Sequence, residues 1–517
     1  MSIVRDDGSS YEILRRYSEF VALKDVLGGT FPLPPKRALS TSIMPLAWVG
    51  NELIKERISG LQAYLVDLLH DAARRDRPEL LKFLAPAGER VNAVDMVSRN
   101  MASVTQGAVL ASSRKMEPEV SRFVAGSYYP AWCTETHPPS KIDFSKFDII
   151  FYAFATPNGV SGIDWDDGSQ QTLKSLVSAA RGSGHATKIV LSVGGWGGSH
   201  WFSHVMSSDA TRAKFIKCLE ETIKTYDLDG IDIDWEYPGA PGAGNPHSPS
   251  DVQNLLMFFK ALRSCIGQDK IISSAVTQTP WLGPNGSPLT DVTEYGKYMT
   301  YVNIMNYDVY DSSPHPGPNA PLVWHWMIRT YTATGNFCGT SKQPQASAQA
   351  AFAQWTKAGM PASKLLLGLP LYGYVSKSTD KKLTGSAIPA ASDPRSPFVA
   401  HLHRPSIPFH APLGDLSSLW GQQIAFSRLV SSGALRKNQD GNYDASNGYT
   451  MGWDNCSDTP YIFDTSRTTV VTYDDTFSIG SKTTFAKSSG MGGCFTWSMD
   501  QDDNMCLHKV VLRNMGK

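Results

Sequence analysis

The chain has 517 residues, 48 basic and 48 acidic side chains, 41% hydrophobic residues and 10% aromatic residues. At roughly 150 residues per domain, this length predicts two to four domains. The net charge of zero, with both signs interspersed, argues against nucleic acid as a partner and against a global attraction to membranes. There is no apolar run of about 18 residues, so the sequence predicts no membrane-spanning helix.

The seven cysteines are widely spaced and form no C-x-x-C motif. This spacing argues against a zinc site and a dense disulfide scaffold, although one or two disulfides remain compatible with a secreted chain. The first residues include Asp6 and Asp7 and lack the long apolar stretch of a secretory signal. We therefore expect no secretory signal and leave the compartment open.

The N-terminal segment, residues 1–86, is the first predicted domain. Residues 11–20 read as a short strand that turns into a helix, and residues 31–36 form a proline-rich extended loop. Apolar residues then recur at three- and four-residue steps, which predicts a helix over about 52–84.

Three motifs in this segment, in this order, resemble the phox-homology (PX) domain, a phosphoinositide-binding module. They are Arg15-Arg16-Tyr17-Ser18-Glu19-Phe20, then Leu33-Pro34-Pro35-Lys36, then Glu56-Arg57 with Leu61-Gln62-Ala63-Tyr64-Leu65. The resemblance implies that Arg16 grips the 3-phosphate and that Tyr17 stacks under the inositol ring. Lys36 and Arg57 would complete a basic cup, because several cations must converge on a multiply charged headgroup. The family's first strand is short or missing here, so we expect a partial domain; ordinary solvated charges are the alternative.

Residues 87–121 are small, polar and weakly patterned, which predicts a linker. From 122 to 515, short apolar runs alternate with helical stretches, which predicts a parallel (β/α)8 TIM barrel. The gap between the seventh and eighth strands is too long for one crossover, so we expect an α+β subdomain over about 374–490 that walls one side of a cleft. The eight expected strands are Val124–Tyr129, Asp148–Phe154, Lys188–Gly195, Gly230–Glu236, Ile271–Val276, Tyr301–Tyr307, Leu365–Pro370 and Gly492–Trp497.

The fourth expected strand carries three acids at alternate positions, Asp232, Asp234 and Glu236. Alternation puts all three on one face, which in a barrel points inward and climbs to the C-terminal mouth. Burying three acids is costly unless function requires it, and coupling raises some of their pKa values. Glu236, the last of the three, is best placed to act as a general acid. A metal site or a structural ion cluster is the alternative, but no fixed ligand set surrounds the acids, so we expect neither metal nor organic cofactor.

The stretch D-G-x-D-x-D-x-E at Asp229–Glu236 resembles glycoside hydrolase family 18, the chitinase family, and the likeness runs over nearly all of 122–515. The family uses substrate-assisted retaining catalysis, in which the substrate acetamido oxygen is the nucleophile. The resemblance implies that Glu236 is acid and then base, that Asp234 orients the acetamido group, and that Asp232 shares a proton with Asp234. Tyr307 would form a hydrogen bond with the acetamido carbonyl. Further matching pieces are Ser192–Gly195, Met305–Asp308, Gly368–Gly373, Tyr473–Asp475 with Ser478 and Lys482, and Trp497.

The same resemblance implies a sugar-binding cleft that takes chitin or chitooligosaccharides. Trp497 would floor the site, and Met305 and Asp308 would shape the acetamido pocket. Tyr128, Phe154 and Trp196 lie at expected strand ends, where aromatic faces can stack on sugar rings.

Some features depart from the family pattern. Residues 323–337 fit it poorly and read as an insertion. A PX-like module suggests a cytosolic or endosomal membrane face, whereas chitinases usually act outside the cell. The functional expectation is an endo-acting chitinase, a monomer. The alternatives are an inactive chitin lectin or lipid-directed adaptor, and an endo-β-N-acetylglucosaminidase acting on N-glycans.

Overall fold

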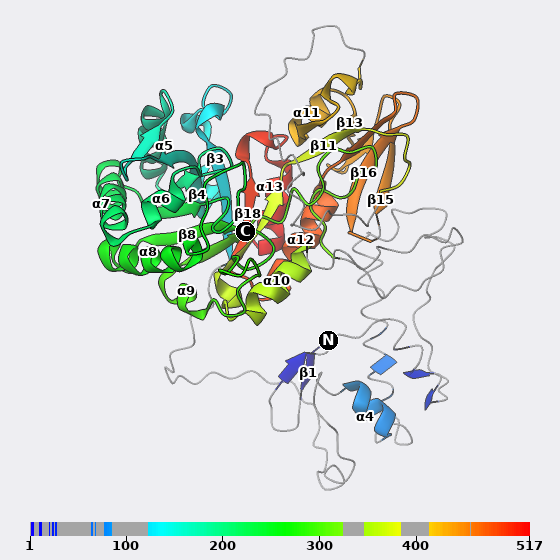
Figure 1. Cartoon of the computed structure of the whole chain (residues 1–517). Coiled ribbons are helices and arrows are strands. Elements are labelled where there is room, and N and C mark those ends of the chain that lie inside the picture. The colour runs from blue at the N-terminus through cyan, green and yellow to red at the C-terminus, as the bar shows by residue number, and fades with distance from the viewer. Residues whose placement is uncertain are drawn as a thin grey trace. The chain divides into compact units, whose positions relative to one another are not determined.

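The computed structural model divides the chain into two compact units, Met1–Met116 and Glu117–Lys517, which we describe separately (Figure 1). The described residues are 2–4, 10–12, 20, 23–24, 26–27, 61, 64–65, 68, 77–84, 123–323, 346–383, 413–454 and 456–517.

In the first unit, β1 (Ser2–Val4) pairs antiparallel with β2 (Ser10–Glu12). The helix expected over 52–84 is interrupted: Arg77 is not helical and α4 (Pro78–Leu84) begins at the next residue. Proline pushes the preceding residue out of the helical region and suits a first helical turn, which explains the break. A small apolar cluster contains Phe20, Leu23, Leu27, Tyr64, Leu65, Leu68, Leu80 and Leu84.

The second unit contains a closed barrel of eight parallel strands, as predicted. Each strand pairs with its two neighbours, and β3 pairs with both β4 and β18, which closes the ring. A further short strand, β5 (Ile163–Trp165), adds antiparallel to the end of β4. The barrel strands are β3 (Val124–Pro130), β4 (Ile149–Pro157), β6 (Lys188–Gly194), β7 (Gly230–Asp234), β8 (Ile271–Val276), β9 (Tyr301–Ile304), β10 (Leu365–Pro370) and β18 (Gly493–Trp497).

Helices surround the barrel strands (Figure 1). They are α5 (Ser169–Gly182), α6 (Phe202–Met206), α7 (Asp209–Tyr226), α8 (Asp251–Ile266), α9 (Thr293–Tyr298), α10 (Ala348–Lys357), α12 (Thr476–Ser488) and α13 (Cys506–Met515). Short 3-10 turns are η2 (Ala131–Cys133), η3 (Pro139–Lys141), η4 (Phe144–Lys146), η5 (Ala362–Lys364), η6 (Ser417–Leu419) and η7 (Met499–Gln501). Side-chain caps fix where two of these helices begin. Ser208 and Thr211 form a capping box before α7, and Asp475 and Ser478 form one before α12.

An α+β subdomain is inserted between β10 and β18. Its antiparallel sheet has the order β12-β11-β17-β16-β15. It is narrower than the expected 374–490, because α12 packs against β10 and β18 and therefore belongs to the barrel. The subdomain elements are β11 (Tyr372–Lys377), β12 (Gln422–Ala425), α11 (Phe426–Ser431), β13 (Leu435–Lys437), β14 (Tyr443–Ala445), β15 (Thr450–Asp454), β16 (Thr459–Asp464) and β17 (Thr469–Thr472).

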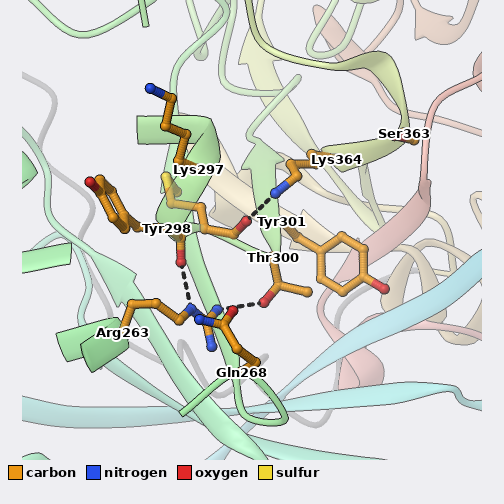
Figure 2. Close-up of a pocket in the computed structure, with 9 residues that line it drawn as sticks. Arg263, Gln268, Lys297, Tyr298, Thr300, Tyr301, Ser363 and Lys364 are labelled. Atoms are coloured by element: carbon orange, nitrogen blue, oxygen red, sulfur yellow. Dashed lines mark hydrogen bonds between the residues drawn. The ribbon is translucent and has the colours of Figure 1, made fainter. Parts of the chain in front are cut away.

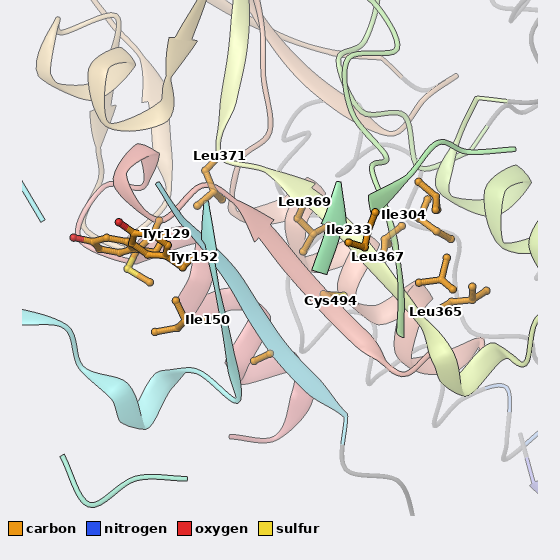
Figure 3. Close-up of a cluster of buried hydrophobic side chains, with 14 of the residues drawn as sticks. Tyr129, Ile150, Tyr152, Ile233, Ile304, Leu365, Leu367, Leu369, Leu371 and Cys494 are labelled. Carbon is orange, nitrogen blue, oxygen red and sulfur yellow. The ribbon is translucent and has the colours of Figure 1, made fainter. Parts of the chain in front are cut away.

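Alternation along the barrel strands separates two apolar cores. In β10, Leu365, Leu367 and Leu369 belong to the large outer cluster between strands and helices, part of which Figure 3 shows. Leu366 belongs instead to the inner cluster, together with Phe151 and Phe495. The inner face of the barrel is therefore filled, and the polar side chains on that face are buried among apolar ones.

None of the helices among the described residues is long and apolar enough to cross a membrane. Within the same residues, no group of three or more His, Cys, Asp or Glu side chains is arranged to hold a metal ion. Cys456 forms a disulfide, whereas Cys133, Cys218, Cys265, Cys494 and Cys506 are not disulfide-bonded.

Candidate active site

Strand β7 and the two residues after it carry the three acids on one face. Asp232, Asp234 and Glu236 are 0%, 4% and 9% exposed. The alternate residues face the outer core, where the Trp235 ring stacks on Phe202 with centroids 5.2 Å apart. The strand periodicity predicted this division into an acidic inner face and an apolar outer face.

Asp232, the deepest acid, is surrounded by hydrogen-bond donors. Its Oδ2 accepts from the Tyr128 hydroxyl at 2.8 Å and from Ser192 Oγ at 2.7 Å. Its Oδ1 accepts from Ser273 Oγ at 2.7 Å and from Asn303 Nδ2 at 3.2 Å. Burial raises the pKa of Asp232, while the three hydroxyl donors lower it. The four donors suit a buried carboxylate, which needs its lone pairs satisfied.

Asp234 and Glu236, the other two acids on this face, both have raised pKa values. Asp234 Oδ1 is buried and has no hydrogen-bond partner among the described residues. Burial, followed by the charges of Glu236 and Asp232, raises the pKa of Asp234 well above its ordinary value. Burial raises the pKa of Glu236 to about 7, with Asp308 contributing in the same direction. A carboxyl group with this pKa can be a proton donor near neutrality.

The proton that we expect Asp232 to share with Asp234 stays a prediction, and the hydrogen bonds show how Asp232 is held. Both oxygens of Asp232 are engaged with donors, and no hydrogen bond joins the two acids in the described structure. The charges of both neighbouring acids, Glu236 and Asp232, act on Asp234 and raise its pKa after the larger effect of burial.

The backbone around Glu236 is held by side chains that the sequence motifs did not reveal. The Glu236 backbone N–H donates to Ser199 Oγ at 2.9 Å, and Ser199 donates to the Gly195 carbonyl at 2.9 Å. Asn245 Nδ2 donates to the Glu236 carbonyl at 3.1 Å. Gly194 has φ of +117°, and an added Cβ would lie 2.1 Å from the Asp234 carbonyl oxygen. The position therefore requires glycine.

A second group of side chains comes from the segment after β9 and from β11. Asp308 Oδ1 accepts from the Tyr372 hydroxyl at 2.5 Å and from the Tyr374 hydroxyl at 2.7 Å. Tyr307 is 8% exposed, and its ring packs edge-on against Tyr372 with centroids 6.1 Å apart. Met305 is half-buried and packs against the inner core. These predicted residues therefore lie together. Burial, followed by the charges of Asp234, Asp308 and Glu236, raises the pKa of Tyr307 well above its ordinary value.

Aromatic rings continue from the barrel floor toward the surface. Trp497, half-buried at the end of β18, stacks on Phe154 with centroids 5.8 Å apart and planes 27° apart. Phe154 in turn lies 6.5 Å from the ring of Trp132, which is 43% exposed. Trp196 is half-buried and packs edge-on against Tyr237. The row offers apolar faces of the kind that sugar rings stack on.

Tyr128 differs from the expected cleft aromatics. It is 1% exposed, and its hydroxyl bonds Asp232 rather than facing open space. Its ring lies edge-on to Trp497, with centroids 5.2 Å apart. Tyr128 is therefore buried beneath the site, where it supports Asp232 and the tryptophan floor.

A pocket of about 350 Å³ lies elsewhere, where β8, β9 and β10 begin (Figure 2). Its basic groups are already engaged: Arg263 donates to the carbonyls of Tyr298, Gly267 and Lys270. Lys364 donates to the carbonyls of Gly296 and Met299. Catalytic groups of such barrels lie at the opposite, C-terminal ends of the strands, so this pocket is structural.

The remaining predicted site residues, Arg16, Tyr17, Lys36 and Arg57, lie outside the described residues. Most of the poorly fitting segment 323–337 also lies outside them, and only Val323 is described.

A closed parallel barrel with three inward-facing acids at its C-terminal mouth and aromatic rings beside them is an arrangement typical of glycoside hydrolases built on a TIM barrel. The chain belongs to glycoside hydrolase family 18: the model of the glycosyl hydrolases family 18 matches residues 125–502. The PX domain model matches residues 4–87. Both resemblances predicted from the motifs are thereby confirmed.

Individual relatives agree with this assignment. The chain is 32% identical over 409 residues to a "chitinase-like effector" of Moniliophthora roreri, over 76% of this chain and 93% of that protein. It is 30% identical to the chitinase RmChi1 of Rhizomucor miehei, with a TM-score of 0.59 over 76% of this chain and 100% of that structure. A family 18 chitinase of Cycas revoluta in complex with (GlcNAc)3 shares the fold, with 22% identity and a TM-score of 0.56 over 76% and 99%.

Proposed function

We propose that this chain is a chitinase that hydrolyses β-1,4 linkages between N-acetylglucosamine units by substrate-assisted retaining catalysis. The observation that carries the proposal is the pair formed by Glu236 and Asp234. Glu236 has a pKa of about 7, and the adjacent Asp234 has a buried oxygen without a partner among the described residues. The first group suits proton donation, and the second suits a substrate N–H.

In the first step, Glu236 gives its proton to the glycosidic oxygen as the bond from that oxygen to the anomeric carbon breaks. The acetamido oxygen of the same sugar attacks the anomeric carbon, forming an oxazolinium ion. Asp234 accepts a hydrogen bond from the acetamido N–H, and the Tyr307 hydroxyl donates to the acetamido oxygen. A neighbouring nucleophile of this kind can have an effective molarity of about 10⁵ M or more.

In the second step, Glu236 removes a proton from water, and the water oxygen opens the oxazolinium ring at the anomeric carbon. Two displacements on the same carbon retain its configuration. Trp497 supports the apolar face of the reacting sugar, and Phe154 and Trp196 contact sugars on either side. Asp232, already provided with four donors, would favour a proton on Asp234 through its negative charge.

Two curated relatives, from Moniliophthora roreri and Moniliophthora perniciosa, are named "chitinase-like effector", which keeps a binding role as the second candidate. That role would be an inactive chitin lectin or a lipid-directed adaptor. The presence of Glu236 favours hydrolysis. A related activity on the chitobiose core of N-glycans is the third candidate. The inserted subdomain, which we expect to wall one side of the cleft, favours chitin over it.

The test is hydrolysis of chitohexaose, with products identified by mass spectrometry and their anomers by NMR. We expect dimers and trimers released as β-anomers, and loss of at least about a thousandfold in kcat for Glu236→Gln. Glu221→Gln, on the exposed face of α7, is the matched control and should keep full activity. A folded, chitin-binding wild type that cleaves neither chitohexaose nor an N-glycan would refute the enzymatic proposal and favour the lectin.

We also propose that residues 4–87 bind phosphoinositide through Arg16, Tyr17, Lys36 and Arg57. The match to the PX family supports this proposal. The test is co-sedimentation with phosphatidylcholine vesicles, with and without phosphatidylinositol 3-phosphate. Arg16→Ala should abolish lipid-dependent binding, and Arg77→Ala, at an exposed arginine paired with Glu79, should not.

For the arrangement of the chain, we propose domains at 1–86 and 122–515, joined by a linker over 87–121, in a monomer. Limited proteolysis should cleave first within 87–121 and release two resistant fragments. Light scattering coupled to gel filtration should give a mass near 57 kDa, and a dimeric mass would contradict the proposal.

A further inference from the structure

A chain of hydrogen bonds runs from the inserted subdomain into the catalytic centre. Gln423, on β12, donates from Nε2 to the Tyr374 hydroxyl at 2.8 Å. Tyr374, on β11, donates to Asp308 Oδ1 at 2.7 Å. Asp308 is one of the groups that raise the pKa of Glu236. The hydrogen bonds thus connect the subdomain to Asp308, and the charge of Asp308 acts on the proposed acid.

The donor inventory fixes the direction of this chain. An amide nitrogen can only donate, so the Tyr374 oxygen accepts from Gln423. The single hydroxyl proton of Tyr374 is then left for Asp308, which can only accept while ionised. Tyr374 is 7% exposed, so water competes little for this proton.

Asp308 is also fixed through its backbone. Its φ is +55°, in the left-handed region, and its N–H donates to Asn319 Oδ1 at 2.9 Å. Asn319 Nδ2 donates to the Tyr372 carbonyl at 3.1 Å, which ties the same turn to β11. Backbone and side chain of Asp308 are therefore both anchored to the strand that carries its two tyrosine donors.

We propose that Tyr374 and Gln423 are positioning residues that hold Asp308 as an oriented carboxylate in the candidate active site. The inserted subdomain would thereby set the pH range in which the acid works. This inference rests on the proposed hydrolytic function. Several titratable groups from the surrounding elements act on Asp308 or Glu236. Strand β11 contributes Tyr372 and Tyr374, strand β7 contributes Asp234, and Tyr237 follows that strand. The segment after β9 contributes Tyr307 and Asp311.

The sign of the expected effect follows from the charges. Removal of the Tyr374 hydroxyl takes one donor from the Asp308 carboxylate, so the pKa of Asp308 rises and Asp308 binds a proton at higher pH. A neutral Asp308 no longer opposes ionisation of Glu236, so Glu236 loses its proton at lower pH. On the basic side of the pH profile, kcat/KM should therefore begin to fall at a lower pH.

The experiment measures kcat/KM on chitohexaose against pH for Tyr374→Phe and Gln423→Leu. One matched control is Tyr461→Phe in the same sheet, which removes a hydroxyl that donates to the Lys381 carbonyl. The other is Gln422→Leu, on the same strand as Gln423. We expect the basic limb to move down by about half a pH unit in Tyr374→Phe, less in Gln423→Leu, and not in the controls. Lower activity with an unmoved limb, or an equal shift in the controls, would overturn the proposal.

A second readout separates this inference from the proposed function. The chain labelled with ¹³C at glutamate carboxyl carbons is titrated by NMR, and the Glu236 signal is identified by its absence in Glu236→Gln. The Glu236 midpoint should fall in Tyr374→Phe even if the wild type proves inactive. An inactive wild type with this shift would refute the hydrolytic function alone, and an unshifted midpoint would refute the positioning role alone.

Discussion

The raised pKa of Glu236 has a consequence for stability that Glu236→Gln should reveal. A glutamate in water ordinarily has a pKa of 4.5, and burial raises the pKa of Glu236 to about 7. Between these values the folded chain binds more protons than the unfolded chain, so this group favours folding below pH 4.5 and loses that contribution as pH rises to about 7. The difference of about 2.5 pH units corresponds to about 3 kcal/mol, at 1.36 kcal/mol for each unit. Glutamine resembles the protonated acid and keeps its contribution at every pH.

The assay is thermal unfolding of wild type and Glu236→Gln, followed by near-ultraviolet circular dichroism from pH 4 to 8.5. For the unit of about 400 residues, 3 kcal/mol corresponds to a shift of about 4 °C in Tm. The variant should melt with the wild type near pH 4 and about 4 °C above it at pH 8. The N-terminal unit is common to both proteins, so its contribution cancels in the difference. If the difference in Tm between the two proteins stays constant from pH 4 to 8.5, Glu236 does not have the raised pKa.

Two other predictions follow from buried charges. Because Glu236 must be protonated to act as an acid, kcat/KM on chitohexaose should fall about tenfold for each pH unit above about 7, and a flat profile to pH 9 would contradict the assignment. Lys482 and Asp474 form a fully buried ion pair, so Lys482→Met should lower the free energy of unfolding by about 3–5 kcal/mol, and Lys482→Met with Asp474→Leu should recover most of that loss in urea denaturation.

The barrel could be predicted because each strand is a short apolar run with a distinct boundary. All eight expected strands occur within a few residues of their predicted limits. The insertion was predicted too wide because helix α12 follows the last subdomain strand directly, starting at its own Asp475 cap, and only packing assigns it to the barrel. The expected helix over 52–84 overlooked Pro78, although proline and the residue before it mark a probable helix boundary.

The candidate site also has one part that the sequence predicts and another that only the structure reveals. The faces of Asp232, Asp234 and Glu236 follow from a period of two and needed no structure. The support of Asp232 by Ser273 and Asn303 comes from two neighbouring strands, and no local motif records such a contact. A signal was nonetheless present, because a serine and an asparagine inside buried apolar strands require hydrogen-bond partners.

Asp234 is the residue that best distinguishes hydrolysis from binding. The aromatic faces of Trp497 and Phe154 are sufficient to hold a sugar, and a binding protein gains nothing from a third buried acid. Asp234 is costly: it is 4% exposed, its Oδ1 has no partner among the described residues, and two other acids lie beside it. A substrate N–H would supply the missing partner, and the charge that develops on the reacting sugar would offset the repulsion. A bound sugar could supply the same N–H without being hydrolysed, so the missing partner does not separate the two functions. The repulsion among three buried acids does, because only the positive charge that develops during hydrolysis would offset it.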